Sequence, residues 1–163
     1  MTFSKYLNKI YNRCKRYLRV LRYRNSTRHK EYSAWIRQKE YLSYRSQDKL
    51  EIIKEGDVFW SAIGSNIGKE VDGKSGRFSR PVLVFKKWSD DLFLSIPTST
   101  RINTKNEYKY KINLDGIEQV LVFNQARSLD TRRVYNKIGS LDRKELDNIK
   151  LKFIEYIKQY APD

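Results

Sequence analysis

The residues best suited to chemistry flank a glycine-rich segment in the middle of the chain. Residues 68–73 read GKEVDG, and Arg80 follows a short polar loop and leads directly into the apolar run PVLV. A strand holds its backbone rigidly, so an arginine at its rim can be aimed at a phosphate, which the guanidinium binds through a planar fork of donors. Glu70 places a carboxylate at the other end of this segment. The arrangement indicates a site for a phosphate-containing partner.

Few other residue types in the chain could support catalysis or bind a metal. His29 is the sole histidine and lies in a basic segment near the N-terminus, and Cys14 is the sole cysteine. Cys14 cannot form an internal disulfide or build a zinc site alone. Asp90 and Asp91 have the pattern of an exposed turn and not the spacing of metal ligands. We therefore expect no metal and no cofactor.

Charge is the strongest compositional feature of the chain. The formal net charge is +15 over 163 residues, which points to a polyanionic partner such as a nucleic acid, an acidic protein or an anionic membrane surface. A hydrophobic content of 39% is sufficient for a folded core. No apolar run approaches the roughly 18 residues of a transmembrane helix, and the N-terminus has no signal-peptide pattern. We therefore expect a cytosolic protein with no membrane partner.

Charge and periodicity divide the chain into a basic helical extension over residues 1–50 and a barrel domain over residues 51–163. The extension contains 14 Lys/Arg against 3 Asp/Glu, whereas the remainder contains 20 against 16. The extension has no Pro or Gly, and apolar residues at spacings of three and four predict its first helix: Leu7, Ile10, Tyr11, Cys14, Leu18 and Leu21. A second helix is expected over residues 28–44, after the break at Asn25-Ser26-Thr27.

Two interpretations of the extension are open at this point. In the first, it is an arm that follows phosphates, with Tyr17, Tyr23 or Trp35 stacking on bases. In the second, it is a helical hairpin that packs on the barrel or on another chain, and its basic face is simply solvated.

From residue 51 onward the pattern changes to short strands. They are expected over residues 58–63, 81–85, 92–96, 108–114 and 120–123. Five short strands with tight connections favour a small closed barrel over a sandwich. A C-terminal helix follows, with a capping box of Asp142 and Glu145 and an apolar stripe of Leu146, Ile149, Phe153, Ile157 and Tyr160. The expected fold class is mainly β with helices.

Five motifs follow one another in the second region. They are GDV at residues 56–58, GKEVDG at 68–73, RPVLV at 80–84, QARSLD at 125–130 and KIG at 137–139. In this order the chain resembles the MazF/PemK family of toxin endoribonucleases, from about residue 54 to about residue 157. The resemblance implies a Src-homology-3-like barrel of the PemK/MazF/CcdB type with a C-terminal helix. It also implies a homodimer that forms its RNA groove across two chains, and an acidic antitoxin that blocks this groove.

The resemblance also implies roles for individual residues. Arg80 matches the essential arginine of the family, and Glu70 matches its loop carboxylate, a candidate proton acceptor or organiser of Arg80. The essential hydroxyl falls on Ser99 in an ungapped match within IPTST, although its neighbours Thr98 and Thr100 remain alternatives. Because side chains alternate along a strand, Thr98 should face away from Ser99.

Substrate-binding roles are implied for a second group of side chains, namely Thr98, Thr100, Gln125, Arg127 and Phe78. Phe78 has two interpretations, since its ring could stack on a base or cover the end of the barrel. Glu70, Gln125 and Arg127 could likewise belong to a network that fixes a loop or a dimer interface.

The activity implied by the resemblance is metal-independent, sequence-selective cleavage of single-stranded mRNA. The 2′-hydroxyl attacks the adjacent phosphorus and leaves a 2′,3′-cyclic phosphate and a free 5′-hydroxyl. Such a toxin would arrest translation until its antitoxin neutralises it. Two rivals are a gyrase inhibitor like CcdB, which shares this fold, and a catalytically inactive RNA-binding module. Arg80 with the Gln125/Arg127 motif disfavours the gyrase inhibitor, which has no use for a phosphate-clamping arginine.

Overall fold

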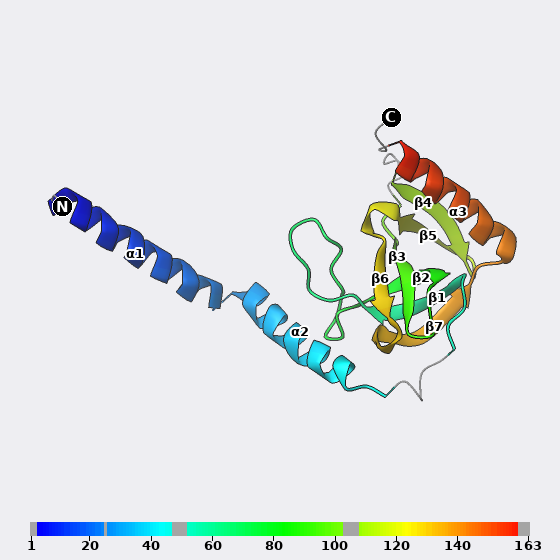
Figure 1. Cartoon of the computed structure of the whole chain (residues 1–163), viewed down its shortest axis with the longest axis horizontal. Helices are drawn as coiled ribbons and strands as arrows, with labels where there is room; N and C mark the ends of the chain where they lie inside the picture. Colours follow the sequence, from blue (N-terminus) through cyan, green and yellow to red (C-terminus); the bar gives the residue numbers. More distant parts are fainter. Residues whose placement is uncertain (1–2, 25, 47–51, 103–107, 160–163) are drawn as a thin grey trace.

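The computed structural model describes residues 3–24, 26–46, 52–102 and 108–159. It contains two N-terminal helices, a seven-stranded antiparallel sheet and a C-terminal helix (Figure 1). The elements are α1 (Phe3–Arg24), α2 (Thr27–Ser43), β1 (Asp57–Ala62), β2 (Ser79–Lys87), β3 (Leu92–Ser99), β4 (Lys109–Leu114), β5 (Ile117–Val122), β6 (Arg127–Asp130), β7 (Val134–Ser140) and α3 (Arg143–Lys158). The expected class, mainly β with helices, is confirmed.

The sheet is strongly curled. Its strand order is β4-β5-β3-β2-β1-β7, and β6 pairs with the first half of β3. Two strands therefore pair with β3 one after the other: β6 pairs with residues 92–95, and β5 pairs with Thr98 and Ser99. The two ends of the sheet approach each other, because a Cβ on Gly139 of β7 would lie 3.0 Å from Leu114 at the end of β4. Sheets curl in this way when right-handed twist accumulates over short strands.

Periodicity did not predict two of the strands, β6 and β7, although the KIG motif at residues 137–139 matches a strand of the family. The four residues of β6 give too short a run for a periodic signal. Strand β7 has mostly polar and partly exposed residues, because it is a terminal strand of the sheet. Strands β2 and β3 are also longer than expected, and these extensions carry Arg80 and Ser99 into the sheet.

Both faces of the central strands are buried. Leu83 and Ile96 belong to a core cluster that α3 covers with Leu146 and Ile149. The residues that alternate with them along the strands, such as Val82 and Phe93, point to the other face and belong to a second cluster with Val134. This explains why residues 81–85 form a continuous apolar run instead of an alternating one.

Helix α3 begins at the expected cap, where the Asp142 side chain accepts a hydrogen bond from Glu145 N at 2.8 Å. Leu146 and Ile149 of the expected stripe are buried and Phe153 is partly buried, whereas Ile157 is 51% exposed. Tyr160 lies outside the described residues.

The two N-terminal helices differ in their relation to the sheet. Helix α2 packs on it through Trp35 and Leu42, which join a cluster with Ala62 and Phe78. Trp35 lies directly on Gly64, where a Cβ would come within 2.7 Å of the indole ring. Trp35 is therefore a core residue, as the packing interpretation predicted.

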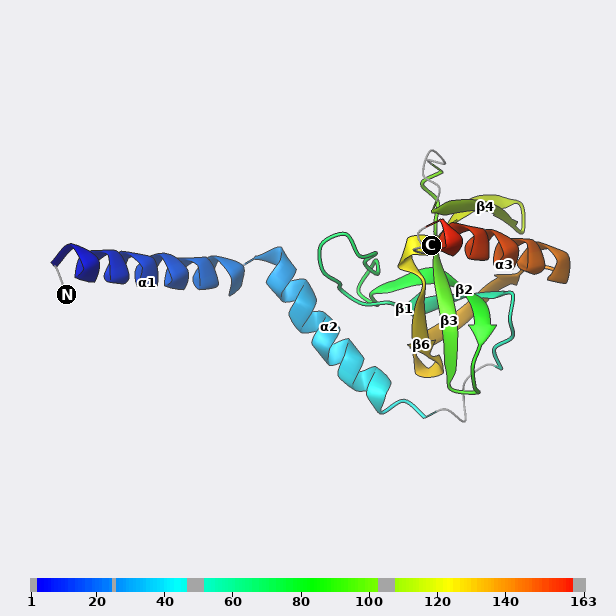
Figure 2. The same ribbon diagram turned by 45° about the horizontal axis from the view of Figure 1, so that its top comes forward.

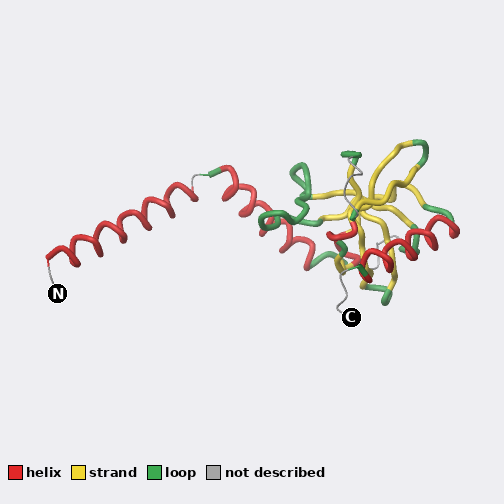
Figure 3. Tube along the Cα trace, turned by 90° about the horizontal axis from the view of Figure 1, so that it is seen from above, coloured by secondary structure: helices red, strands yellow, loops and turns green. Residues whose placement is uncertain are grey.

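Helix α1 extends away from the sheet, and turned views show the same arrangement (Figure 2, Figure 3). Its residues Ile10, Tyr11 and Leu18 are exposed, so this part of the apolar stripe does not pack on the barrel. The side chains of Leu7 and Leu21 lie outside the described ones. Within the described part of the chain, no helix combines the length and apolar character needed to cross a bilayer.

Glu55 connects α3 to the sheet. Its carboxylate accepts hydrogen bonds from Lys150 of α3 at 2.8 Å and from the backbone N of Lys87 at 3.2 Å, and it pairs with Lys86 at 2.9 Å. Burial alone would raise the pKa of Glu55, but the hydrogen bonds from Lys150, Lys86 and the Lys87 backbone lower this pKa to about 2.

Glu55→Gln should therefore reduce the free energy of unfolding at neutral pH by about 1–2 kcal/mol. Because the pKa of Glu55 is lower in the folded state than its ordinary 4.5, the stabilisation is present above pH 4.5 and disappears as the pH falls through about 2. Urea unfolding at a series of pH values should show the wild type and the variant converging over this range. Glu118→Gln, at the exposed pair with Lys111, is the control and should change little. A constant difference at all pH values would contradict this role of Glu55.

Candidate functional site

A polar cleft of about 630 Å³ opens at one end of β2, β3 and β5. It is lined by Lys69, Val71, Lys74, Arg80, Ser99, Arg101, Tyr108, Lys109, Val122, Asn124 and Gln125. Five of these side chains are cationic, and none of the described lining residues is a carboxylate. A concave site with this charge distribution favours an anionic ligand.

Arg80 and Ser99 lie next to each other because of strand register. Strands β2 and β3 pair Val82 with Pro97, and Arg80 and Ser99 each lie two residues beyond this pair and line the same cleft. Opposed residues of an antiparallel pair point to the same face. This face is the one that carries Val82 and Phe93, so the cleft continues one of the two cores out to solvent.

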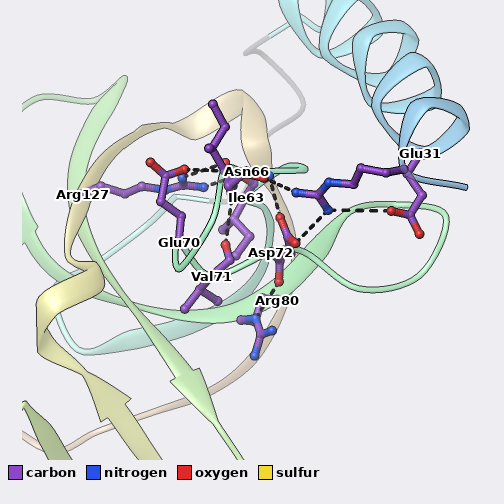
Figure 4. Close-up of polar contacts among 10 residues, drawn as sticks. Glu31, Ile63, Asn66, Glu70, Val71, Asp72, Arg80 and Arg127 are labelled. Atoms are coloured by element: carbon purple, nitrogen blue, oxygen red, sulfur yellow. Dashed lines mark hydrogen bonds and ion pairs between the residues drawn. The ribbon is translucent and has the colours of Figure 1, made fainter. Parts of the chain in front are cut away.

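Arg80 is oriented by the loop that precedes β2. Its Nε donates to the carbonyl oxygen of Asp72 at 3.0 Å (Figure 4). No described residue accepts a hydrogen bond from its two Nη atoms. Burial of the guanidinium and the charge of Arg101 lower the pKa of Arg80 from its ordinary value. An anion between the two arginines would relieve their repulsion.

The loop is held in place by side chains on both of its flanks. Gln125 Oε1 accepts from Val71 N at 2.9 Å, and Asn66 Nδ2 donates to Val71 O at 2.7 Å. The turn before β2 also needs a glycine, because a Cβ on Gly73 would lie only 1.8 Å from the carbonyl oxygen of Phe78. Gln125 thus lines the cleft and supports its wall.

The three neighbouring hydroxyls are in different environments. Ser99 lines the cleft, and its Oγ accepts from Arg101 N at 3.2 Å. Thr98 is 2% exposed and donates to Gln119 Oε1 at 2.7 Å, on the opposite face of β3. Thr100 is exposed beyond the end of β3 and does not line the cleft. Of the three, Ser99 alone shares the cleft with Arg80.

Glu70 and Arg127 are not brought to the cleft. The Glu70 carboxylate accepts from Ile67 N at 3.1 Å and lies on the side of the loop where Arg127 is found (Figure 4). Arg127 donates to the Ile63 carbonyl and to Asn66 Oδ1, at 3.4 Å for the second contact. Both residues therefore contribute to the loop-fixing network that was one of the interpretations of the sequence.

Phe78 is also outside the cleft. Its side chain is 8% exposed, and its ring lies 5.6 Å from that of Trp35 between α2 and the sheet. The structure thus buries Phe78 beneath α2, and a base has no access to its ring.

Several lining residues were not singled out from the sequence. Lys69, Lys74, Arg101 and Lys109 come from loops and strand ends, where sequence pattern does not indicate which way a lysine points. The sequence pattern assigns no role to Asp72 beyond its place in the GKEVDG motif, yet its backbone carbonyl orients Arg80. In the described residues, no group of three or more His, Cys, Asp or Glu side chains is close enough to hold a metal ion.

Comparison with known proteins agrees with this architecture. A family model described as "PemK-like, MazF-like toxin of type II toxin-antitoxin system" matches residues 54–157. The chain belongs to this toxin family. The resemblance in the sequence is thereby confirmed, and a type II toxin has an antitoxin as its partner.

A solved structure shows the same fold. The crystal structure of MazF (Form-I) from Deinococcus radiodurans aligns with a TM-score of 0.52 and 19% identity, covering 66% of this chain and 98% of that chain. The Mycobacterium tuberculosis toxin MazF-mt6 aligns with a TM-score of 0.46 and 10% identity, covering 63% and 96%. A search of curated proteins finds no significant match. The MazF-like fold is thus present in this toxin, and α1 and α2 precede the family match.

The different environments of Thr98 and Ser99 lead to a prediction about stability. Thr98→Val should lower the free energy of unfolding by about 1–3 kcal/mol, because Gln119 Oε1 would lose its donor in the interior. Ser99→Ala should change it by less than about 0.5 kcal/mol, since the hydroxyl faces the cleft. Chemical denaturation of the two variants measures both effects. Equal losses would mean that Ser99 also has a structural role.

Proposed function

We propose that this toxin is a metal-independent endoribonuclease that cleaves single-stranded RNA. The observation that carries the proposal is the cleft in which Arg80 and Ser99 lie together among five cationic side chains, with no carboxylate in its described lining. This site can bind a phosphodiester and stabilise additional negative charge on it.

In the proposed reaction the substrate supplies its own nucleophile. The 2′-hydroxyl oxygen forms a bond to the adjacent phosphorus, and the bond from phosphorus to the 5′-oxygen breaks. The 2′-hydroxyl gives up one proton and the leaving 5′-oxygen takes up one, so water can accept and supply them and no oxidant or metal is consumed. Arg80 stabilises the pentacovalent phosphorane through its Nη donors, and Ser99 donates a hydrogen bond to a phosphoryl oxygen.

The remaining cleft residues would bind the RNA strand. Lys69, Lys74 and Lys109 can contact flanking phosphates. Gln125 can position the substrate from the cleft wall, whereas we assign Glu70 and Arg127 to the loop and not to proton transfer. The paired antitoxin would neutralise the toxin by covering this cleft.

The substrate and the chemistry can be tested together. Cleavage sites are first mapped on a mixed-sequence RNA in excess EDTA, where activity should persist. A short oligonucleotide with a single 2′-deoxy substitution at the mapped site should then resist cleavage, because the nucleophile is missing. Cutting of the deoxy substrate or dependence on a divalent cation would exclude the mechanism.

Arg80→Ala should reduce the cleavage rate at least about a hundredfold, with a smaller loss of RNA binding, because its contacts strengthen in the transition state. Ser99→Ala should also slow cleavage. Arg77→Ala is the matched control, since Arg77 is exposed on the preceding loop, stacks on Tyr135 and does not line the cleft. Binding without cleavage in the wild type would support the inactive RNA-binding module, and inhibition of gyrase without RNA binding would support a CcdB-like toxin.

The basic helix α1 leads to a separate prediction for RNA binding. Arg16, Arg19 and Arg22 are exposed on α1, so replacing all three by Gln should leave the thermal midpoint unchanged. If α1 follows the RNA backbone, the salt dependence of binding should flatten by about 0.7 in log–log slope for each lost phosphate contact. Replacing Lys144, Lys152 and Lys158 on α3 by Gln removes the same number of positive charges and is the control. An equal change in both triple variants would mean that only total charge matters.

A further inference from the structure

A side chain of the N-terminal extension reaches the loop that orients Arg80. Arg28 lies in the first turn of α2, and its Nη1 donates to Asp72 Oδ2 at 3.0 Å. Its Nη2 donates to the carbonyl oxygen of Asn66. Arg28 precedes the region that matches the toxin family, which begins at residue 54.

Asp72 links Arg28 to the cleft. Its carboxylate is bound by Arg28, while its backbone carbonyl accepts from Arg80 Nε at 3.0 Å. Asp72 Oδ1 also accepts from Asn66 N at 2.5 Å. The side chain and the main chain of one residue therefore connect the extension to the arginine of the site.

The helix that carries Arg28 is itself fixed to the sheet. Trp35 packs on Gly64 and Phe78, close to the start and the end of the same loop. Further along α2, Gln38 donates to the Tyr135 hydroxyl at 3.0 Å, and Arg45 just beyond its end donates to the Arg132 carbonyl at 3.0 Å. A side chain on such an anchored helix can hold a loop in one position.

We propose that Arg28 is a positioning residue for Arg80, so that α2 is a functional part of the site. This inference rests on the proposed ribonuclease function. The ion pair is partly exposed, with 46% and 40% of the two side chains accessible, so its contribution to global stability is small. Its effect is on the position of the Asp72 carbonyl, and hence on the direction in which the Arg80 fork points. Misalignment of a transition-state contact reduces the chemical step more than substrate binding.

Arg28→Ala should lower kcat on a saturating RNA oligonucleotide about tenfold, with KM changed less than about twofold and the thermal midpoint retained. Arg37→Ala is the matched control, because Arg37 is an exposed arginine on the same helix, away from the loop. Arg28→Lys should restore part of kcat, since an ammonium can still pair with Asp72 but lacks the fork that also binds Asn66. An unchanged kcat would overturn the proposal, and so would a higher KM at constant kcat, which would make Arg28 an RNA-binding cation.

A double-mutant cycle with Asp72→Asn tests the route. Asp72→Asn keeps the backbone carbonyl that binds Arg80 but weakens the pair with Arg28. If Arg28 acts through Asp72, the double variant should be no slower than the slower single variant. Additive losses would overturn the route through Asp72.

Amide hydrogen exchange provides a measurement that does not depend on cleavage. The full-length Arg28→Ala variant should show faster exchange at the amides of Asn66 and Val71, whose acceptors lie in the loop network, and unchanged exchange in β2. Protection equal to wild type would overturn the proposal. A wild-type protein that cleaves no RNA would refute the proposed function, whereas the exchange result would still report whether Arg28 holds the loop.

Discussion

The structure of the cleft depends on the repulsion between its cationic side chains, which costs electrostatic free energy. The loop that precedes β2 is arranged so that Arg80 keeps its charge in spite of this repulsion. Arg80 and Arg101 are close enough for the charge of one to lower the pKa of the other, and Arg80 is partly desolvated. The described lining of the cleft offers no carboxylate in compensation. Arg80 Nε instead binds a backbone carbonyl, that of Asp72. The Asp72 carboxylate offsets part of the lowering of the Arg80 pKa, but it is itself paired with Arg28. The positive field therefore remains available to a phosphate.

The Asp72 carbonyl can orient Arg80 only if the loop before β2 keeps one conformation. The amino-acid composition of this loop favours many conformations. Glycines occur at positions 64, 68, 73 and 76, and the non-glycine residues Ser75 and Phe78 have positive φ angles of 61° and 50°. Such a segment loses much conformational entropy when it is ordered. Contacts from outside the loop offset this loss: Gln125 on one side, Arg28 on the other, and Trp35 over the start of the loop. The glycines let the loop turn closely against β2, but they also make it costly to order. The surrounding hydrogen bonds offset this cost.

The sequence could predict the parts of the site that follow from strands. Arg80 and Ser99 are predicted by motif, and both line one cleft at the ends of β2 and β3, where alternation along each strand sets the face on which they lie. The same rule correctly places Thr98 on the opposite face. Much of the fold is predictable from local pattern as well, since β2 is a continuous apolar run and α1 and α3 have apolar residues at helical spacing. Strands β6 and β7 are not, because one is very short and the other is polar at the sheet edge.

What sequence alone could not predict are contacts between segments far apart in the chain. Arg28 and Asp72 are separated by 44 positions, and nothing distinguishes Arg28 from the other arginines of a region with 14 basic residues. The same limitation applies to Glu70, which the motif places near Arg80 in sequence but which the turn directs toward Arg127 instead.

The N-terminal extension, which looked uniform in charge, therefore has two parts with different physical roles. Helix α1 is exposed and its described residues include no acidic side chain, so its charge acts on whatever approaches from solution. Helix α2 instead directs Trp35 and Arg28 toward the sheet and its loop, where they contact Gly64, Phe78 and Asp72. Because the same helix contacts the loop at its start, at Asp72 and near its end, we expect a displacement of α2 to shift the carbonyl that orients Arg80. In the proposed function α2, but not α1, would therefore act together with the cleft, even though the family match begins only after α2 ends.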